Sequence, residues 1–225
     1  MTRVLVLTAV DVEARGLAGH LGLERVRQSA WPHFGAGALE IACVGLRASQ
    51  LPARAPELGP FDVVISAGAC GALAPGLAAG ELVVPEVVVD AAGRRWPTTS
   101  LRRVAAAGTL LTVAEVVETS AQKSRLWLET GARAVDMESA HILDWAATRG
   151  VPAAVIRGVS DGAERGVPAA LAASVRDDGR VRPLRAVTAA LARGAAFADL
   201  LQLRAGTEAA LKSVAGALAT LARHG

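Results

Sequence analysis

Short, continuous apolar runs rich in β-branched residues recur along the chain and predict the strands of a buried sheet. Such runs lack the alternation of a half-exposed strand, which is typical of strands covered on both faces in a mainly parallel sheet. We expect seven of them, with Pro85 marking an edge or bend in the fourth. They cover residues 4–10, 39–44, 61–67, 81–89, 110–117, 132–135 and 153–159.

Helical spacing of apolar residues appears between and after these runs. Asp11 can cap a helix behind the first strand, and residues 139–149 are typical of a helix. Two further helices are expected near 183–193 and 197–223, and the second has one apolar stripe. The stripe consists of Leu211, Val214, Leu218 and Leu221. Strands alternating with helices predict one α/β domain over residues 1–225, with a mixed, mostly parallel central sheet flanked by helices.

Composition narrows the classes of protein. Among 225 residues, 52% are hydrophobic and 20% charged, which favours a packed domain over disorder. The net charge is only +3 and the arginines are scattered without stacking aromatics, so we expect no nucleic-acid partner. Cys43 and Cys70 have no metal-site spacing, and we expect no metal and a reduced, cytoplasmic protein. The sequence shows neither a signal peptide nor an apolar stretch of about 20 residues, the length of a membrane span.

Acidic residues follow several predicted strands. Glu13, Glu138 and Asp161 come shortly after strand ends, and a glycine-bearing turn at 68–71 follows the third strand. Because open α/β sheets bind ligands at the carboxyl ends of their strands, these groups would meet in one cleft. A carboxylate there could stabilise a sugar cation, and an acid could protonate a departing base. Strand-end carboxylates also serve as ordinary helix caps, so spacing alone leaves both interpretations open.

Three ordered motifs resemble the nucleoside phosphorylase and nucleosidase superfamily. They are VLVLTAVDVEA, FDVVISAGACGALAPGLAAGELVVPEVVVD and AVDMESAHILDWAATRGVPAAVIRGVSD. The last combines a Met-Glu pair, a helix, a strand and a terminal Ser-Asp. The resemblance extends over nearly the whole chain. It implies a nucleoside phosphorylase or nucleosidase that cleaves the N-glycosidic bond of a purine-type nucleoside and releases the base, with adenine expected.

The resemblance also implies a role for each matching residue. Glu13 would activate water, Glu138 would bind the ribose hydroxyls, and Asp161 would protonate or hydrogen-bond N7 of the purine. Met137 would pack beneath the ribose, and Ser160 would help orient the loop that carries Asp161. The nucleophile site would be lined by the backbone around Thr8, Ala9, Gly68 and Ala69.

Two positions depart from the superfamily pattern. Ala69 stands where many relatives have Ser or Thr, which removes a hydroxyl for binding phosphate or water. Arg47 lies in a loop that is usually glycine-rich; it either binds phosphate in compensation or is an ordinary surface arginine. The nucleophile, water or phosphate as co-substrate, therefore stays open, and no other cofactor is implied. The segment between Trp96 and Thr109 is short for the superfamily, which would leave the base and 5′ side more open.

Within the superfamily the chain is most similar to hopanoid-associated phosphorylases, through GRRWP, ETSAQKSRL to VDMES, and VRDDGRVRPLRAVTAALAR. That similarity implies adenine release from adenosylhopane in hopanoid biosynthesis. Futalosine hydrolase and methylthioadenosine nucleosidase-like hydrolases are the alternatives, and a nucleoside-binding module without the reaction is an alternative of another class.

The resemblance bears on partners as well. Relatives are dimers or hexamers whose partner subunit often completes the site, so we expect a homodimer. If the substrate has an apolar tail, the last helix and a leucine cluster could contact it or a membrane surface, and the favoured alternative for the helix is ordinary packing on the sheet. The cluster consists of Leu200, Leu201 and Leu203. Residues 163–180 form an excursion from the core that would serve as a lid.

Overall fold

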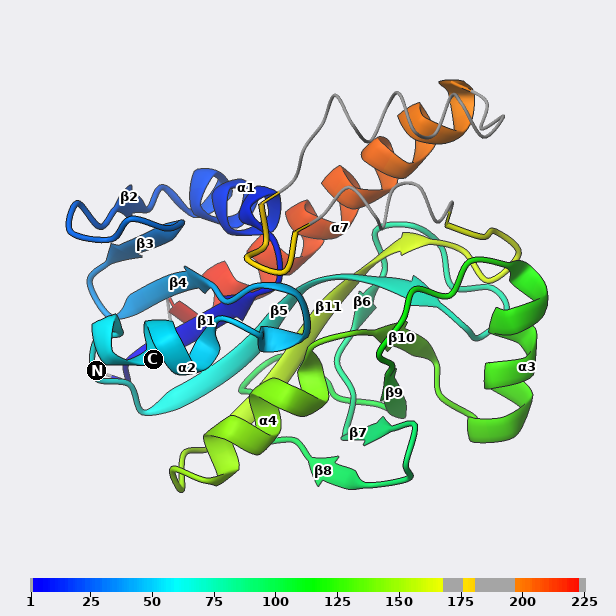
Figure 1. The fold of residues 1–225 in the computed structure, drawn as a ribbon, viewed down its shortest axis with the longest axis horizontal. Helices are drawn as coiled ribbons and strands as arrows, with labels where there is room; N and C mark the ends of the chain where they lie inside the picture. Colours follow the sequence, from blue (N-terminus) through cyan, green and yellow to red (C-terminus); the bar gives the residue numbers. More distant parts are fainter. Residues whose placement is uncertain (1, 168–175, 181–196, 223–225) are drawn as a thin grey trace.

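The computed structural model describes residues 2–167, 176–180 and 197–222. These residues form one sheet of eleven strands with helices on both faces (Figure 1). The strands are β1 Val4–Thr8, β2 Glu24–Arg25, β3 His33–Ala36, β4 Leu39–Cys43, β5 Val63–Ala72, β6 Leu82–Val83, β7 Val87–Asp90, β8 Arg95–Pro97, β9 Thr109–Thr112, β10 Ala134–Asp136 and β11 Ala153–Asp161. The helices are α1 Asp11–Leu21, α2 Leu51–Arg54, α3 Ser120–Thr130, α4 Ser139–Ala147 and α7 Phe197–Ala222, with 3-10 turns η1 Leu46–Ala48 and η2 Ala55–Glu57.

The sheet order is β2-β3-β4-β1-β5-β10-β9-β7-β8, and β11 pairs with β5 and β6. Its centre is parallel, since β1 pairs in parallel with both β4 and β5, and β11 pairs in parallel with β5. Antiparallel pairs occur towards the periphery and between β5 and β10. The prediction of a mixed, mostly parallel sheet flanked by helices is therefore confirmed.

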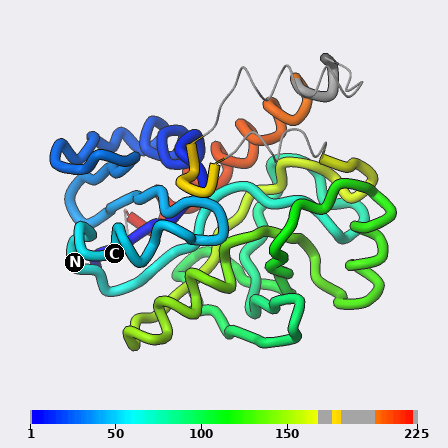
Figure 2. The backbone as a smooth tube through the Cα atoms, in the orientation of Figure 1, coloured from blue at the N-terminus to red at the C-terminus, as the bar shows by residue number. Residues whose placement is uncertain are grey.

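Both faces of the central strands are covered, which explains their uninterrupted apolar sequences. Val6 of β1 packs in one core with α1 and with Leu211 of α7. Its neighbours Leu5 and Leu7 belong to a second core on the other face, with Ile142 of α4. Figure 2 shows α1 and α7 close together on the first of these faces. A strand buried on both sides leaves its carboxyl end as the place where polar groups can gather.

The structure corrects two sequence-based predictions at strand boundaries. The glycine-bearing segment 68–71 is not a turn but the second half of β5, because it pairs with β11 as far as Asp161. Residues 81–89 form two strands, β6 and β7, with the break at Pro85, which has no N–H to donate to a ladder.

The predicted helices differ in outcome. The last is confirmed as α7, and the expected helix near 183–193 lies outside the described residues. Asp11 is the first residue of α1 rather than its cap, which is Val10. In the part of the chain that the structure describes, no helix combines the length and the apolar character needed to cross a bilayer.

Candidate active site

A cavity of about 220 Å³ lies at the carboxyl ends of β1, β5, β10 and β11. Seven of the residues predicted for the site line it, contributed by segments far apart in the sequence. They are Ala9, Glu13, Ala69, Met137, Glu138, Ser160 and Asp161. The sheet topology thus brings together the three carboxylates that the sequence places after separate strands.

Glu13 lies in the first turn of α1 and is buried. Its Oε2 accepts hydrogen bonds from the backbone N–H groups of Ala9 at 3.1 Å and Val10 at 3.2 Å. Its Oε1 accepts from the N–H of Ala69 at 2.8 Å. Burial raises the pKa of Glu13, while the Arg157 charge and these N–H groups oppose the rise. The result is a fixed carboxylate at the edge of the cavity, suited to accept a proton.

Gly68 allows the close approach of β5 to Glu13. Its φ is +148°, and a Cβ at this position would lie 2.4 Å from Glu13 Oε1. Any side chain would therefore displace the Glu13 carboxylate.

We expect the Gly68→Ala variant to lower the turnover number for base release about 100-fold, because a displacement of about 1 Å in a reacting group has such an effect. The matched control is Gly76→Ala, where φ is +85° and no atom lies within 4 Å of the added Cβ. Base-release kinetics and thermal unfolding of both variants provide the measurement. Equal activity in the two variants would show that contact with Glu13 is irrelevant.

Glu138 occupies the N-cap position of α4 and is also buried. Its Oε1 accepts the backbone N–H of Arg47 at 3.1 Å, and its Oε2 lies 3.8 Å from Nη2 of Arg157. Burial raises the pKa of Glu138 to about 7, with Arg157 opposing this effect and Asp136 and Glu13 adding to it. Because Arg157 lies closer to Asp136, at 2.7 Å, the charge of Glu138 is only partly compensated, and an ionised Glu138 favours a developing cation beside it.

This pKa predicts a pH dependence. If ionised Glu138 is required, kcat/KM for base release should fall about tenfold per pH unit below about pH 7, where the carboxylate takes up a proton. The measurement is a pH profile of kcat/KM between pH 5 and 9 for the natural chain and for Glu138→Gln. The variant should be slow throughout and should lack the inflection near neutrality. An unchanged inflection in the variant would assign it to another group.

Asp161 ends β11, directly after an irregularity in the pairing with β5 between Val159 and Asp161. Such a bulge redirects a side chain, and here Asp161 lines the cavity. Its Oδ1 accepts a hydrogen bond from Ser160 Oγ at 2.5 Å, and its Oδ2 accepts one from Lys123 Nζ. The predicted orienting role of Ser160 is consistent with this contact, and Ser160 Oγ also lies 3.1 Å from the carbonyl oxygen of Cys70.

Three predicted site residues do not line this cavity. Thr8 is completely buried, and its Oγ1 has no hydrogen-bond partner among the described residues. Gly68 lies behind Glu13. The Arg47 guanidinium is partly exposed and pairs with Asp177 Oδ1 at 3.0 Å. Of the two interpretations of Arg47, the geometry favours the surface arginine, although its backbone N–H holds Glu138.

The segment 176–180, part of the predicted lid, is bonded to the loop that carries Arg47. The carbonyl oxygen of Asp177 accepts the N–H of Leu46 at 3.1 Å and the hydroxyl of Ser49 at 2.7 Å. Residues 168–175 lie outside the described residues, so the lid stays a prediction.

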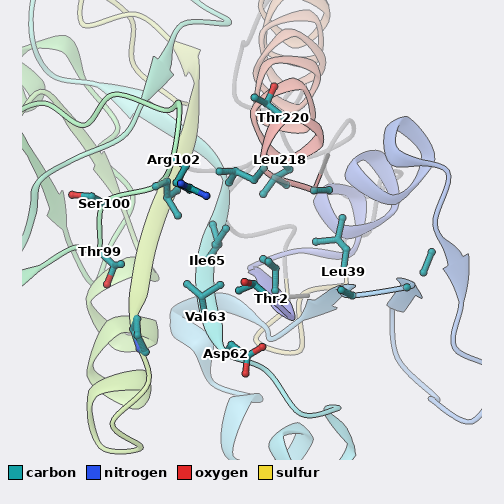
Figure 3. Close-up of a pocket in the computed structure, with 18 residues that line it drawn as sticks. Thr2, Leu39, Asp62, Val63, Ile65, Thr99, Ser100, Arg102, Leu218 and Thr220 are labelled. Atoms are coloured by element: carbon teal, nitrogen blue, oxygen red, sulfur yellow. The ribbon is translucent and has the colours of Figure 1, made fainter. Parts of the chain in front are cut away.

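A larger cavity, of about 460 Å³, lies at the opposite end of the sheet, beside the starts of β1 and β5 and the last turns of α7 (Figure 3). Its described lining is mostly apolar, and the charged members are Asp62 and Arg102. Asp62 already accepts the N–H of Arg3 at 2.8 Å. The larger volume therefore does not make this cavity the candidate active site. The smaller cavity is the candidate because several acidic side chains converge on it.

Part of the chain matches a known protein family. Residues 97–192, which include Glu138 and Asp161, match the family model described as the phosphorylase superfamily. The predicted resemblance to the nucleoside phosphorylase and nucleosidase superfamily is confirmed. This match and the fold support the predicted enzyme class, a nucleoside phosphorylase or nucleosidase. No curated protein matches the chain.

Solved structures with the superfamily fold cover almost the entire chain. A 5′-methylthioadenosine/S-adenosylhomocysteine nucleosidase from Helicobacter pylori is 16% identical, with 99% of this chain and 98% of that chain covered and a TM-score of 0.70. The futalosine hydrolase of Helicobacter pylori strain 26695 is 16% identical over 99% and 97%, with a TM-score of 0.70. The 5′-methylthioadenosine nucleosidase of Arabidopsis thaliana is 17% identical over 98% and 96%, with a TM-score of 0.69.

The sequence analysis missed two buried cations at the candidate site, and Arg157 is the more central. It is wholly buried in β11, where Nη2 lies 2.7 Å from Asp136 Oδ2 and donates to Ser66 Oγ at 2.9 Å. Its positive charge partly compensates Glu13 and Glu138. The sequence could have revealed Arg157, because it interrupts the apolar run AAVIRGV of a predicted buried strand, and a buried charge needs a partner.

The second missed cation is Lys123 of α3, which lines the cavity and is buried. The other charged groups in the lining are acidic: Glu13, Glu115, Asp136, Glu138 and Asp161. Among the described residues, no group of three His, Cys, Asp or Glu side chains is arranged to hold a metal ion. The described lining is therefore predominantly anionic.

Proposed function

We propose that the chain hydrolyses the N-glycosidic bond of a purine-type nucleoside and releases the base, with adenine as the expected product. The observation that supports this most directly is the convergence of Glu13, Glu138 and Asp161 on one cavity. The match of residues 97–192 to the phosphorylase superfamily model and the nucleosidase-like fold support the reaction class.

In the proposed reaction the bond between ribose C1′ and purine N9 breaks, and its electron pair leaves with the base. The ribose ring becomes cationic, and the Glu138 carboxylate stabilises it. Glu13 accepts a proton from the water that attacks C1′, and N7 of the departing base receives a proton from the Asp161 side of the cavity. Met137 lines the same cavity and is proposed to pack against the ribose.

Water is the proposed nucleophile because the lining favours it over phosphate. A phosphate dianion would approach five lining carboxylates, and the cation among the described lining residues, Lys123, is already paired with Asp161. The Arg47 guanidinium, the candidate phosphate ligand, pairs with Asp177 instead. Ala69 contributes no hydroxyl group, but its N–H fixes Glu13, as water activation requires.

The identity of the substrate depends on the group that the nucleoside carries at its 5′ position. We keep adenosylhopane as the proposed substrate on the sequence similarity to hopanoid-associated phosphorylases, with methylthioadenosine and futalosine as alternatives. Leu201 is 51% exposed, which supports an apolar or membrane contact of α7. The side chain of Leu200 lies outside the described residues. Homodimer formation stays a prediction from the resemblance, and a cytoplasmic location stays a prediction from the cysteine content.

The decisive experiment incubates the purified protein with adenosine, methylthioadenosine, futalosine or adenosylhopane, with and without phosphate, in water enriched in oxygen-18. We expect free base without phosphate and free ribosyl product labelled at C1′. Formation of a ribose 1-phosphate product would contradict hydrolysis. Thermal stabilisation by adenine without any base release would favour the nucleoside-binding module.

A further inference from the structure

Lys123 makes a direct contact with the proposed acid of the reaction. Its side chain is 1% exposed, and Nζ donates hydrogen bonds to Asp161 Oδ2 and to the carbonyl oxygen of Gly162 at 2.8 Å. The residue lines the same cavity as Glu13 and Glu138. Lys123 is therefore not only a packing residue, because its ammonium group is bonded to a residue of the candidate site.

The hydrogen bonds around Asp161 indicate where the transferable proton is. Both carboxylate oxygens accept, Oδ1 from Ser160 and Oδ2 from Lys123. An ammonium group has donors but no acceptor, so the oxygen facing it carries no proton. In this arrangement the proton that a departing base needs is on Lys123 Nζ rather than on Asp161.

We infer that Lys123 supplies the proton for the departing base and does so through Asp161. This inference rests on the proposed nucleoside hydrolysis. As C1′–N9 breaks, Lys123 Nζ gives a proton to Asp161 Oδ2, and the Asp161 carboxyl group formed in this way passes that proton to purine N7. The water oxygen bonds to C1′ and its proton goes to Glu13. One proton lost from Glu13 and one gained by the lysine amine, both exchanged with solvent, restore the site.

The choice of lysine in this chain supports a proton-donating role. Among 24 lysines and arginines the sequence has only two lysines, Lys123 and Lys212. A guanidinium keeps its proton under all ordinary conditions, whereas an ammonium group can release one. The same site uses Arg157 where a permanent counter-charge beside Asp136 is needed. Of the two buried cations, only Lys123 can release a proton, and proton supply to the base requires this.

Lys123 acts through Asp161 and is a positioning residue, so its test must separate proton supply from structural support. Two ribosides achieve this. Adenosine, or the best nucleoside found above, needs a protonated leaving group. A 4-nitrophenyl β-D-ribofuranoside releases a stable phenolate and needs none, yet it uses the same ribose contacts.

The principal variant is Lys123→Arg, which keeps the positive charge beside Asp161 but removes the transferable proton. We expect kcat for the nucleoside to fall about 100-fold with KM nearly unchanged, while cleavage of the nitrophenyl riboside stays close to that of the natural chain. Lys123→Met, of similar length and without charge, should show the same preference for the nitrophenyl riboside. Circular dichroism and thermal unfolding establish that each variant is folded.

The matched controls are Lys212→Arg and Lys212→Met, at an exposed lysine on α7, and they should match the natural chain on both substrates. Near-normal nucleoside turnover in folded Lys123→Arg would reduce Lys123 to a counter-ion and overturn the inference. Equal losses on both substrates would assign it a structural role and overturn it as well. If the natural chain cleaves neither riboside, the hydrolase proposal itself fails, which is a separate outcome.

Discussion

Asp161→Asn should reduce the turnover number for nucleoside hydrolysis about 1,000-fold, within the range that general acid catalysis contributes. The amide keeps the shape of the side chain but cannot pass a proton to the departing base. It also leaves the buried Lys123 ammonium facing a neutral group. Because the substitution removes one partner of a buried ion pair, the free energy of unfolding should also fall, so turnover is compared at a temperature at which the variant is folded.

This prediction is measured by base release under saturating nucleoside. The matched control is Asp144→Asn on α4, where an exposed carboxylate accepts a bond from Trp96 at 3.3 Å and does not line the cavity. The control should retain full activity. Normal turnover in the Asp161 variant would remove this residue from the mechanism and with it the proposed path of the proton.

Arg157→Met should lower the free energy of unfolding at pH 7 by about 3–5 kcal/mol, the cost of breaking a buried ion pair from one side. The variant leaves Asp136, Glu13 and Glu138 buried without their shared positive neighbour. The pKa of Glu13 is already raised and that of Glu138 is raised to about 7, so the folded state binds protons that the unfolded state releases, for Glu138 between about pH 4.5 and 7. Stability of the variant should therefore improve as the pH falls through that window.

Urea unfolding at pH 7 and pH 5.5 tests both parts of this expectation. Arg149→Met is the control, because that guanidinium is exposed and lies 4.2 Å above the Trp145 ring, where a loss of about 1 kcal/mol or less is expected. Equal losses at positions 149 and 157 would mean that Arg157 does not compensate the acids.

The sequence predicted the central sheet well because burial on both faces leaves a strong local pattern. The apolar runs of β1 and β11, the second of which contains Arg157, place those strands and their carboxyl ends. Short peripheral strands such as β2 and β3 were not predicted, because strands this short at the edge of the sheet carry little apolar signal. The segment 68–71 was misjudged because glycines usually mark turns, whereas at Gly68 the glycine allows a strand to approach Glu13.

The candidate site was predictable to the extent that its residues follow strands. Glu13, Glu138 and Asp161 were found in this way, and they line one cavity. Lys123 could not be found from spacing, because it comes from α3 and reaches Asp161 only through the packing of that helix against the strand ends. Arg157 carried a visible signal that local pattern reasoning did not use. A charged residue inside a predicted buried strand implies that oppositely charged side chains lie next to it, which apolar periodicity alone does not show.

The way in which Glu138 is held has a consequence for how the site can vary. Its oxygen is bound by the main-chain amide of position 47, so substitution of that side chain by any residue except proline leaves the bond donor in place. The backbone there has a φ of +53°, a conformation that glycine adopts without strain. Substitution between glycine and arginine at position 47 is therefore compatible with an unchanged placement of the Glu138 carboxylate, while the arginine adds a contact with Asp177 that a glycine would lack.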